Sequence, residues 1–326
     1  MKVLWIHNWN PSKLPPHIIN PIKGFRELDV NINLEYLGNL RSPKNVYEKI
    51  KYLKDISKNY DLIHSQYGSM CSYIGSFIRN KPKIMSLHGS DFNINNSQID
   101  FNNLHTRIAR YLSVKSINHY NHVISVSNRM KNEILNLFPS KKVTTIPVPI
   151  ILKDFHPMSL RDARRKLNFD QNAIIIMFNI ADMTASVKRL QLAINSIELL
   201  KKKIPNVYLN IVSNIDYKDV PLHVNASNII LLTSKREGWP NSIKEALACN
   251  IPFVSTDVSD LSFIAKKEES CKIAEPNIND ITEKIIDSLN SKRDINLRKH
   301  VEHMDVISTC KKIHDLYKLT IENFKN

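Results

Sequence analysis

The segment SKREGWPNSIKEALACNIPFVSTD, Ser234 to Asp257, sets out one unit of the fold in a single stretch. A helix is expected to begin near Pro240, because proline suits the first turn of a helix. It is expected to stop at Cys249-Asn250, where asparagine tolerates the left-handed conformation. The apolar run from Ile251-Pro252 then predicts a buried strand. The segment therefore predicts a loop, a helix and a strand of an α/β sheet.

Short apolar bursts alternate with amphipathic stretches along the rest of the chain. The expected strands lie within MKVLWIHNW, YDLIHSQYG, KIMSLHGSD, HVISVS and VTTIP in the first half, and within AIIIMFN, VYLNIVSN, NIILLTS and IPFVSTD in the second. Such alternation is typical of parallel sheets covered by helices on both faces. We therefore expect two doubly wound Rossmann-like α/β domains, residues 1–150 and 151–305, facing each other across a cleft.

The last part of the chain has apolar residues at helical spacing. The pattern predicts helix throughout Leu297 to Phe324. Its final part, about 306–326, is expected to pack on its own domain or back on the first. Ligands of doubly wound sheets bind beyond the carboxyl ends of the strands, so the expected site is the cleft.

Composition excludes several classes of protein. The chain has 326 residues, 42% hydrophobic and 24% charged, which excludes extended disorder and a coiled-coil rod. No apolar run approaches the roughly 18 residues of a membrane helix. The apolar stretch in MKVLWIHNW is too short for a secretion signal. The expected location is the cytoplasm, with a peripheral position on the inner face of the plasma membrane as an open alternative.

The numbers and spacing of cysteine and glycine disfavour further classes of protein. The four cysteines form no C-x-x-C pair, so we expect buried apolar side chains and neither disulfides nor a zinc site. Only six glycines occur, while asparagine is abundant, so asparagine is expected to make the tight turns. Neither G-x-G-x-x-G nor G-x-x-x-x-G-K-[ST] is present, which disfavours kinases, P-loop ATPases and ordinary dinucleotide dehydrogenases.

The net charge of +15 is uneven, at +11 for residues 1–150 and +4 for residues 151–326. This asymmetry indicates an anionic partner. A lysine-rich surface that reflects a biased genome explains it equally well. Nucleic acid is not expected, because aromatic residues are not clearly interleaved with the basic ones.

Glu237 and Glu245 stand on either side of the predicted helix start near Pro240. The free N–H groups and positive dipole end of a helix start suit a diphosphate. A carboxylate accepts two hydrogen bonds at once, as a vicinal diol requires. A capping box between Ser242 and Glu245 is the structural alternative, since it has the same spacing.

This arrangement resembles the retaining family 4 glycosyltransferases of GT-B architecture and their E-x7-E motif. The matching residues are Glu237, Gly238, Trp239, Pro240, Asn241, Glu245, Ala246, Ala248, Pro252 and Val254. Weaker matches follow in the family's order, LIHSQYG, SLHGSD, VISVSNRM and IPVPIILKDFHP. The resemblance implies a C-terminal domain that binds the nucleotide-sugar and an N-terminal domain that faces the acceptor.

The resemblance also implies roles for individual residues. Glu245 would bind the ribose hydroxyls, Glu237 the hydroxyls of the donor sugar, and Lys188 the leaving diphosphate. The family's usual arginine is replaced by Met183, so Arg189, Lys235 or Arg236 would supply the second positive charge. Lys188 and Arg189 have an alternative reading as surface residues of a helix.

In the first half, the resemblance implies that His88 lies near the donor sugar, with Gly89 and Asp91 completing its motif. A hydrogen-bonded structural role is the alternative for His88. His64, in LIHSQYG, and Asn8 are further candidate substrate contacts. Asn8 lies in the loop after the first strand, where asparagine takes the place of the family's paired glycines.

The sequence contains no D-x-D motif, so we expect no metal and no cofactor. The implied function is metal-independent, retaining transfer of a sugar from a nucleotide diphosphate sugar to a glycan or polyprenyl-linked glycan, in bacterial surface polysaccharide or lipopolysaccharide assembly. A GT-B-shaped nucleotide-sugar epimerase and a non-catalytic nucleotide-sugar-binding partner protein remain alternatives.

An anionic membrane surface is a further expected partner. It would contact basic residues of the first half, namely Lys49, Lys51, Lys54, Lys58, Arg107, Arg110 and Lys115.

Overall fold

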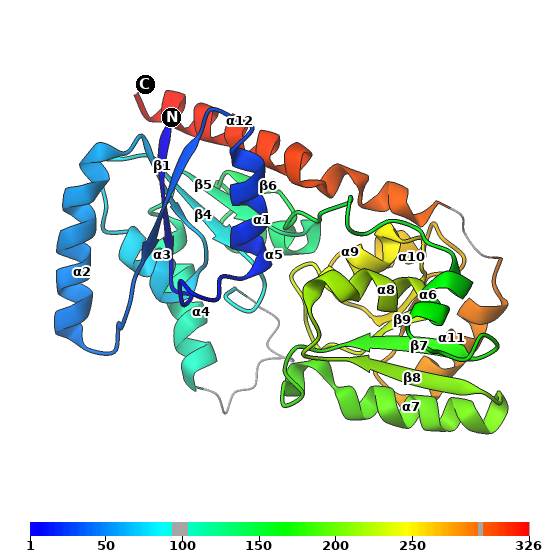
Figure 1. The fold of residues 1–326 in the computed structure, drawn as a ribbon. Helices are drawn as coiled ribbons and strands as arrows, with labels where there is room; N and C mark the ends of the chain where they lie inside the picture. Colours follow the sequence, from blue (N-terminus) through cyan, green and yellow to red (C-terminus); the bar gives the residue numbers. More distant parts are fainter. Residues whose placement is uncertain (93–103, 293–295, 326) are drawn as a thin grey trace. The chain divides into compact units, whose positions relative to one another are not determined.

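The computed structural model describes residues 1–92, 104–292 and 296–325. They form two compact units (Figure 1). Unit 1 comprises Met1–Pro149 with Val306–Asn326, and unit 2 comprises Ile150–Asp305. Each unit is a parallel sheet with helices, so the expected fold class, two Rossmann-like α/β domains, is confirmed.

Unit 1 contains a six-stranded sheet in the order β2-β1-β3-β4-β5-β6, with every neighbouring pair parallel. Its strands are β1 (Lys2–His7), β2 (Asn31–Tyr36), β3 (Leu62–Ser65), β4 (Lys83–Leu87), β5 (His122–Ser125) and β6 (Val143–Thr145). Its helices are α1 (Pro16–Phe25), α2 (Pro43–Ile56), α3 (Ser69–Gly75), α4 (Leu104–Ile117), α5 (Asn128–Leu137) and α12 (Val306–Lys325). The central strands are buried, as their continuous apolar runs predict.

Unit 2 contains a five-stranded sheet in the order β11-β10-β9-β7-β8, again parallel. Its strands are β7 (Ile174–Asn179), β8 (Val207–Val212), β9 (Ile229–Leu232), β10 (Phe253–Thr256) and β11 (Lys272–Ala274). Its helices are α6 (Leu160–Lys166), α7 (Leu190–Lys203), α8 (Val220–Asn225), α9 (Asn241–Ala248), α10 (Leu261–Ala265) and α11 (Ile278–Asn290).

The two sheets share one strand order, because in each the first strand lies between the second and the third. The order reverses between β1 and β3 in unit 1 and between β7 and β9 in unit 2. Parallel sheets of this kind bind ligands just beyond the carboxyl ends of the strands at such a reversal. The topology therefore marks the loops after β1, β3, β7 and β9 as the places to look for a site.

The sequence patterns missed two strands, β2 and β11, and both lie at sheet edges. β2 has the sequence NINLEY and is largely exposed, while β11 has only three residues. Edge strands need no continuous apolar run, because only one side of the strand is paired and much of it meets solvent.

The prediction of helix throughout Leu297 to Phe324 is wrong in its first part. Two 3₁₀ turns occupy Leu297–His300 and Glu302–Met304, and Asp305 is extended with ψ of 152°. Leu297 and Met304 are buried in unit 2, and continuous helix begins only at Val306, where the chain returns to unit 1. The apolar residues that suggest one continuous helix are thus buried in two separate cores.

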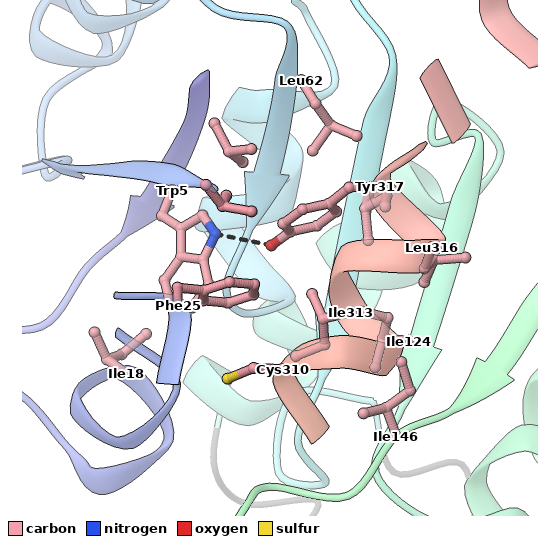
Figure 2. Close-up of a cluster of buried hydrophobic side chains, with 13 residues drawn as sticks. Trp5, Ile18, Phe25, Leu62, Ile124, Ile146, Cys310, Ile313, Leu316 and Tyr317 are labelled. Atoms are coloured by element: carbon pink, nitrogen blue, oxygen red, sulfur yellow. Dashed lines mark hydrogen bonds between the residues drawn. The ribbon is translucent and has the colours of Figure 1, made fainter. Parts of the chain in front are cut away.

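Helix α12 forms part of the unit 1 core. Figure 2 shows Cys310, Ile313, Leu316 and Tyr317 of α12 facing buried side chains of the unit 1 sheet and α1. The Trp5 indole N–H donates to the Tyr317 hydroxyl at 2.9 Å, so the buried polar atoms of both rings are paired.

The expected burial of the cysteines is confirmed, since all four are buried thiols outside any disulfide. The expected use of asparagine in turns is confirmed as well. Asn168, Asn206, Asn214 and Asn250 have positive φ, and Asn250 ends the stretch after α9 as expected. Among the described helices, none is both long and apolar enough to cross a bilayer.

Candidate active site

Two loops of unit 2 are joined where β7 and β9 end. The Thr233 hydroxyl donates to the carbonyl oxygens of Lys188 and Arg189, at 2.7 and 3.0 Å. The Lys235 amide donates to the Val187 carbonyl at 2.8 Å. The Thr256 hydroxyl, at the end of β10, donates to the Ser234 carbonyl at 2.6 Å. These bonds fix the loop that carries Lys188 against the loop that carries Glu237.

Glu237 and Lys188 form an ion pair in this joined region. The Lys188 ammonium lies 2.6 Å from Glu237 Oε1, and the Ser234 hydroxyl donates to the same oxygen at 2.7 Å. The two charged side chains are 28% and 17% exposed, so both are reachable from solvent. Both bonds join groups from the loops that follow β7 and β9, the loops that the topology marks as the place to look for a site.

Arg189 lies beside this pair and has a left-handed backbone, with φ of 51°. Its guanidinium donates from Nη2 to the Ser234 carbonyl at 3.0 Å, while its buried Nε has no hydrogen-bond partner among the described residues. Met183, at the position of the missing arginine, is 50% exposed, Lys235 is exposed and Arg236 is half-buried. Of the three candidates to replace the missing arginine, Arg189 is therefore the one whose guanidinium bonds the backbone of the Glu237 loop in the described hydrogen bonds.

Helix α9 begins at Asn241, directly after Pro240, and has no side-chain cap. The amides of a first helical turn have no partner within the helix and need an external acceptor. Gly238, just upstream, is held in place because the Ser259 hydroxyl donates to its carbonyl at 2.6 Å. The loop and the uncapped helix start together form a place for an anion.

Glu245 lies on α9 and is 4% exposed. Its Oε1 accepts a hydrogen bond from the Tyr217 hydroxyl at 3.1 Å, while its buried Oε2 has no partner among the described residues. Burial raises the pKa of Glu245 to about 7, against the opposing effects of Tyr217 and Lys244. The capping-box alternative is wrong, because Pro240 rather than Ser242 precedes the helix and the carboxylate bonds elsewhere.

Two residues near Glu245 went unrecognised in the sequence. Tyr217 comes from the turn after β8, and nothing local relates it to α9. Lys244 is 1% exposed, and burial lowers its pKa to about 7. Its ammonium lies 5.9 Å from the centre of the buried Trp239 ring. The helical spacing did indicate that Lys244 is buried, because Leu247 and Ala248 lie three and four residues further along on the same face of the helix.

In unit 1, the buried carboxylate of Asp91 organises the loop after β4. It accepts backbone N–H bonds from Gly68 at 2.9 Å, Gly89 at 2.9 Å and His88 at 3.0 Å. Burial raises its pKa, and these three amides oppose the rise. Gly89 has φ of 125°, which favours glycine. Asp91 and Gly89 thus fix the conformation of the loop backbone that carries His88.

A cavity of about 450 Å³ lies at the ends of β1, β3 and β4. Its walls include aromatic and histidine rings from three loops and α1. The His17 and His88 ring centres are 4.4 Å apart, and Trp9 packs edge-on against His17 at 4.5 Å and Tyr67 at 5.3 Å. Asn8 is exposed and lines the same cavity. The sequence indicated His88 and Asn8, but not the rings of Trp9, His17 and Tyr67, which lie in separate segments.

His64 does not line this cavity and is 1% exposed. Its Nδ1 bonds the Tyr317 hydroxyl at 2.6 Å and its Nε2 bonds the Ser86 hydroxyl at 2.8 Å. Burial and the nearby His88 lower its pKa to about 3. His64 is a neutral connection between β3, β4 and α12, and its selection as a substrate contact is corrected on these grounds.

The model of Glycosyltransferase Family 4 matches residues 7–153, and that of Glycosyl transferases group 1 matches residues 209–304. An uncharacterized glycosyltransferase of Methanocaldococcus jannaschii is 25% identical over 289 residues, which cover 84% of this chain and 75% of the relative.

Solved structures share the fold. Sucrose-phosphate synthase from Thermosynechococcus elongatus has a TM-score of 0.78 at 14% identity, covering 99% of both chains. Anabaena HepE in complex with UDP and glucose has a TM-score of 0.71 at 11% identity, covering 98% of this chain and 99% of that one. The two family models and the archaeal relative support a glycosyltransferase enzyme, and the solved structures show that its fold is of GT-B architecture.

Proposed function

We propose that the protein is a retaining, metal-independent glycosyltransferase that uses a nucleoside diphosphate sugar as donor and a glycan or polyprenyl-linked glycan as acceptor. The observation that carries the proposal is the group of Lys188, Glu237 and Ser234 beside the uncapped start of α9, the helix that bears Glu245. Solved complexes of Anabaena HepE hold UDP and UDP-glucose, which supports a UDP-sugar as the first donor to test.

In this proposal each part of the donor meets one part of unit 2. The ribose diol bonds the buried carboxylate of Glu245, whose Oε2 has an acceptor site to offer. The sugar hydroxyls donate hydrogen bonds to Glu237. The diphosphate accepts hydrogen bonds from the Lys188 ammonium, the Arg189 guanidinium and the first amides of α9. The Lys188–Glu237 bond at 2.6 Å then opens or is shared when the donor binds.

The chemical step breaks the bond between the sugar's anomeric carbon and the β-phosphate oxygen. The acceptor hydroxyl forms the new bond from the same face, which retains the anomeric configuration, and its proton passes to the leaving phosphate oxygen. Negative charge grows on the diphosphate as the bond breaks, so Lys188 and Arg189 stabilise the transition state more than the bound donor. No side-chain nucleophile takes part.

The proposal assigns charge neutralisation to these cations and amides rather than to a metal. Within the described ranges, no group of three or more His, Cys, Asp and Glu side chains is placed to hold a metal ion. Activity that persists in excess EDTA is the expected result, and activity that requires Mg²⁺ or Mn²⁺ would replace this part of the proposal.

Unit 1 has the acceptor role in this proposal, and His88 the place near the donor sugar that the family resemblance implies. Asn8 and the rings around the 450 Å³ cavity contact substrate, while Asp91 and Gly89 act through the loop backbone. The proposed setting is the cytoplasmic side of bacterial surface polysaccharide or lipopolysaccharide assembly, and it rests on family association alone.

The family matches favour transfer over both alternatives. An epimerase needs no acceptor, and a partner protein binds without turnover, whereas both family models that match the chain describe glycosyltransferases.

The proposal is tested by incubating the protein with UDP-, GDP- and ADP-sugars, with and without lipid-linked and free glycans. Release of nucleotide that depends on acceptor, together with NMR of the product showing the donor's anomeric configuration, is expected. Inverted product overturns retention. Epimerised donor without nucleotide release overturns transfer.

A further inference from the structure

Helix α4 of unit 1 has an apolar face that no described residue covers. Leu104, Ile108 and Tyr111 are 65%, 47% and 60% exposed. Their spacing of four and three residues puts all three on one side of the helix, at roughly 100° per residue. Helix α4 packs on α3 (Figure 1), and Ser113 and Ser116, on the side of α4 away from the apolar face, are buried. An ordinary surface helix would point its apolar side inward and its polar side outward.

The charged residues of α4 are all positive. Arg107 and Lys115 are exposed and Arg110 is half-buried, and the sequence of α4 contains no acidic residue. The Lys115 ammonium lies 5.7 Å from the Tyr111 ring centre and 5.9 Å from that of Tyr73 on α3. The face therefore combines an apolar strip with cations that extend past its edge.

The acid-free region is wider than the helix itself. Residues 62–90 and 104–132 contain no aspartate or glutamate, while Arg79, Lys81 and Arg129 add further cations. Asp91, at the margin of this region, is completely buried. The next acid in the sequence, Asp100, falls outside the described residues. Eight of the 20 lysines and arginines of residues 1–150 thus lie in two stretches without acids, and one of these stretches contains α4.

Helix α2, the other basic helix of this unit, differs from α4 both in its charges and in its exposed apolar residues. Two of its lysines pair with acids, Lys44 at 3.9 Å from Glu48 and Lys49 at 3.0 Å from Glu35, and Lys58 in the turn after the helix lies 2.8 Å from Asp55. Its exposed large apolar residues are two tyrosines, Tyr47 and Tyr52, and no valine, leucine or isoleucine side chain of α2 is exposed. An anion is attracted less strongly to α2 than to α4.

We propose that α4 is an interfacial helix that docks unit 1 on an anionic lipid bilayer, with Leu104, Ile108 and Tyr111 among the acyl chains. Arg107, Arg110 and Lys115 meet the phosphate headgroups. A bilayer offers an apolar interior directly beneath a layer of negative charge, and this matches both properties of the face. Nucleic acid offers the charge without the interior. The inference concerns unit 1 and is independent of the donor assignment in unit 2.

The test uses the full chain and sedimentation with phosphatidylcholine vesicles that contain about one third phosphatidylglycerol. Wild-type protein is expected to sediment with these vesicles and not with pure phosphatidylcholine. Leu104→Asn/Ile108→Asn is expected to lower the vesicle partition coefficient at least about tenfold, given the contribution of each buried methylene. Arg107→Glu/Arg110→Glu is expected to lower it by more than about twentyfold.

Matched controls come from unit 2. Tyr208→Ser/Phe263→Asn replaces residues that are 54% and 58% exposed, and Lys202→Glu/Lys203→Glu makes the same change of net charge. Both are expected to bind vesicles as wild type does. All variants are expected to keep the wild-type melting temperature and affinity for UDP-glucose. If UDP-glucose does not bind to wild type, the donor proposal fails and the vesicle result still stands.

A direct reporter is Tyr111→Trp, whose fluorescence is expected to shift to the blue with anionic vesicles and to be quenched by doxyl-labelled lipid. Three results overturn the proposal. The first is wild-type protein that does not bind. The second is binding that the Leu104/Ile108 variant retains, which indicates adsorption by charge alone. The third is self-association that this variant abolishes without any binding to vesicles, which assigns the face to a second copy.

Discussion

Glu245 gives the sharpest prediction, because one buried carboxyl links donor affinity, pH and stability. Burial raises its pKa from 4.5 to about 7, so about nine-tenths of the molecules carry the carboxylate at pH 8 and about one-tenth at pH 6. If the ribose diol requires the carboxylate, the Kd of UDP-glucose rises about tenfold between pH 8 and pH 6. UDP-glucose is the suitable ligand, since its diphosphate diester does not titrate in this range.

The same shift predicts the stability of the ligand-free protein. A carboxyl whose folded pKa is raised stabilises the fold fully below pH 4.5, and this contribution is lost as pH rises through about 7. At 1.36 kcal/mol per pKa unit, the charged form costs about 3 kcal/mol above pH 7. Glu245→Gln removes that charge, so the variant is expected to be more stable than wild type at pH 8 while binding UDP-glucose far more weakly.

Calorimetric titration at pH 6, 7 and 8 and urea unfolding at the same values measure both effects. Tyr217→Phe serves as a graded variant, because loss of its hydrogen bond moves the pKa of Glu245 further up and the binding profile towards higher pH. The reasoning is refuted if UDP-glucose affinity is flat from pH 6 to 8 in wild type. A Gln variant that keeps the wild-type pH slope refutes it as well.

Three further variants separate the roles of other residues. Lys188→Ala is expected to lower single-turnover rate about a hundredfold with a much smaller change in donor Kd, and equal losses in both would contradict its role at the leaving diphosphate. Lys244→Met is expected to be more stable than wild type at pH 7 in urea unfolding. The buried lysine's lowered pKa makes wild-type stability rise from about pH 7 towards 10.5, so this advantage should shrink by pH 9, and a constant difference would argue against a neutral amine. Tyr317→Phe leaves the Trp5 and His64 nitrogens without their shared hydroxyl and is expected to cost about 1–3 kcal/mol in urea unfolding, whereas a neutral effect would mean that water replaces it.

The sequence predicted the central strands well, because burial on both faces demands continuous apolar runs. The stretch Ile229–Leu232 and the strand after Ile251-Pro252 are examples of this rule. Edge strands such as β2 were not predicted, because they are partly exposed and need no continuous apolar run. The wrong extension of the final helix has a further cause: spacing reports which residues are buried, but not that Leu297 and Ile313 are buried in different units.

For the site, residues close together in the chain were found and residues from distant segments were not. Glu237 and Glu245 lie eight residues apart, and a family motif records their spacing. Tyr217 and the ring of His17 reach their partners only through the topology of the sheet, since each belongs to another loop or helix. His64 was selected wrongly, because a histidine that ends a strand looks the same in sequence whether it faces a ligand or a buried tyrosine.

The burial of Glu245 and Lys244 side by side on α9 imposes a cost that a purely structural helix would not need. Each group is held with a pKa near 7, so each loses much of its charge at neutral pH in the ligand-free protein. A leucine at either position would pack as well and would stabilise the fold. The same shift leaves Glu245 able to release its proton when a diol arrives, so binding and ionisation become coupled. A polar pair of this kind is expected where a ligand completes the hydrogen bonds, and the partnerless Oε2 of Glu245 is the atom that the ligand would complete.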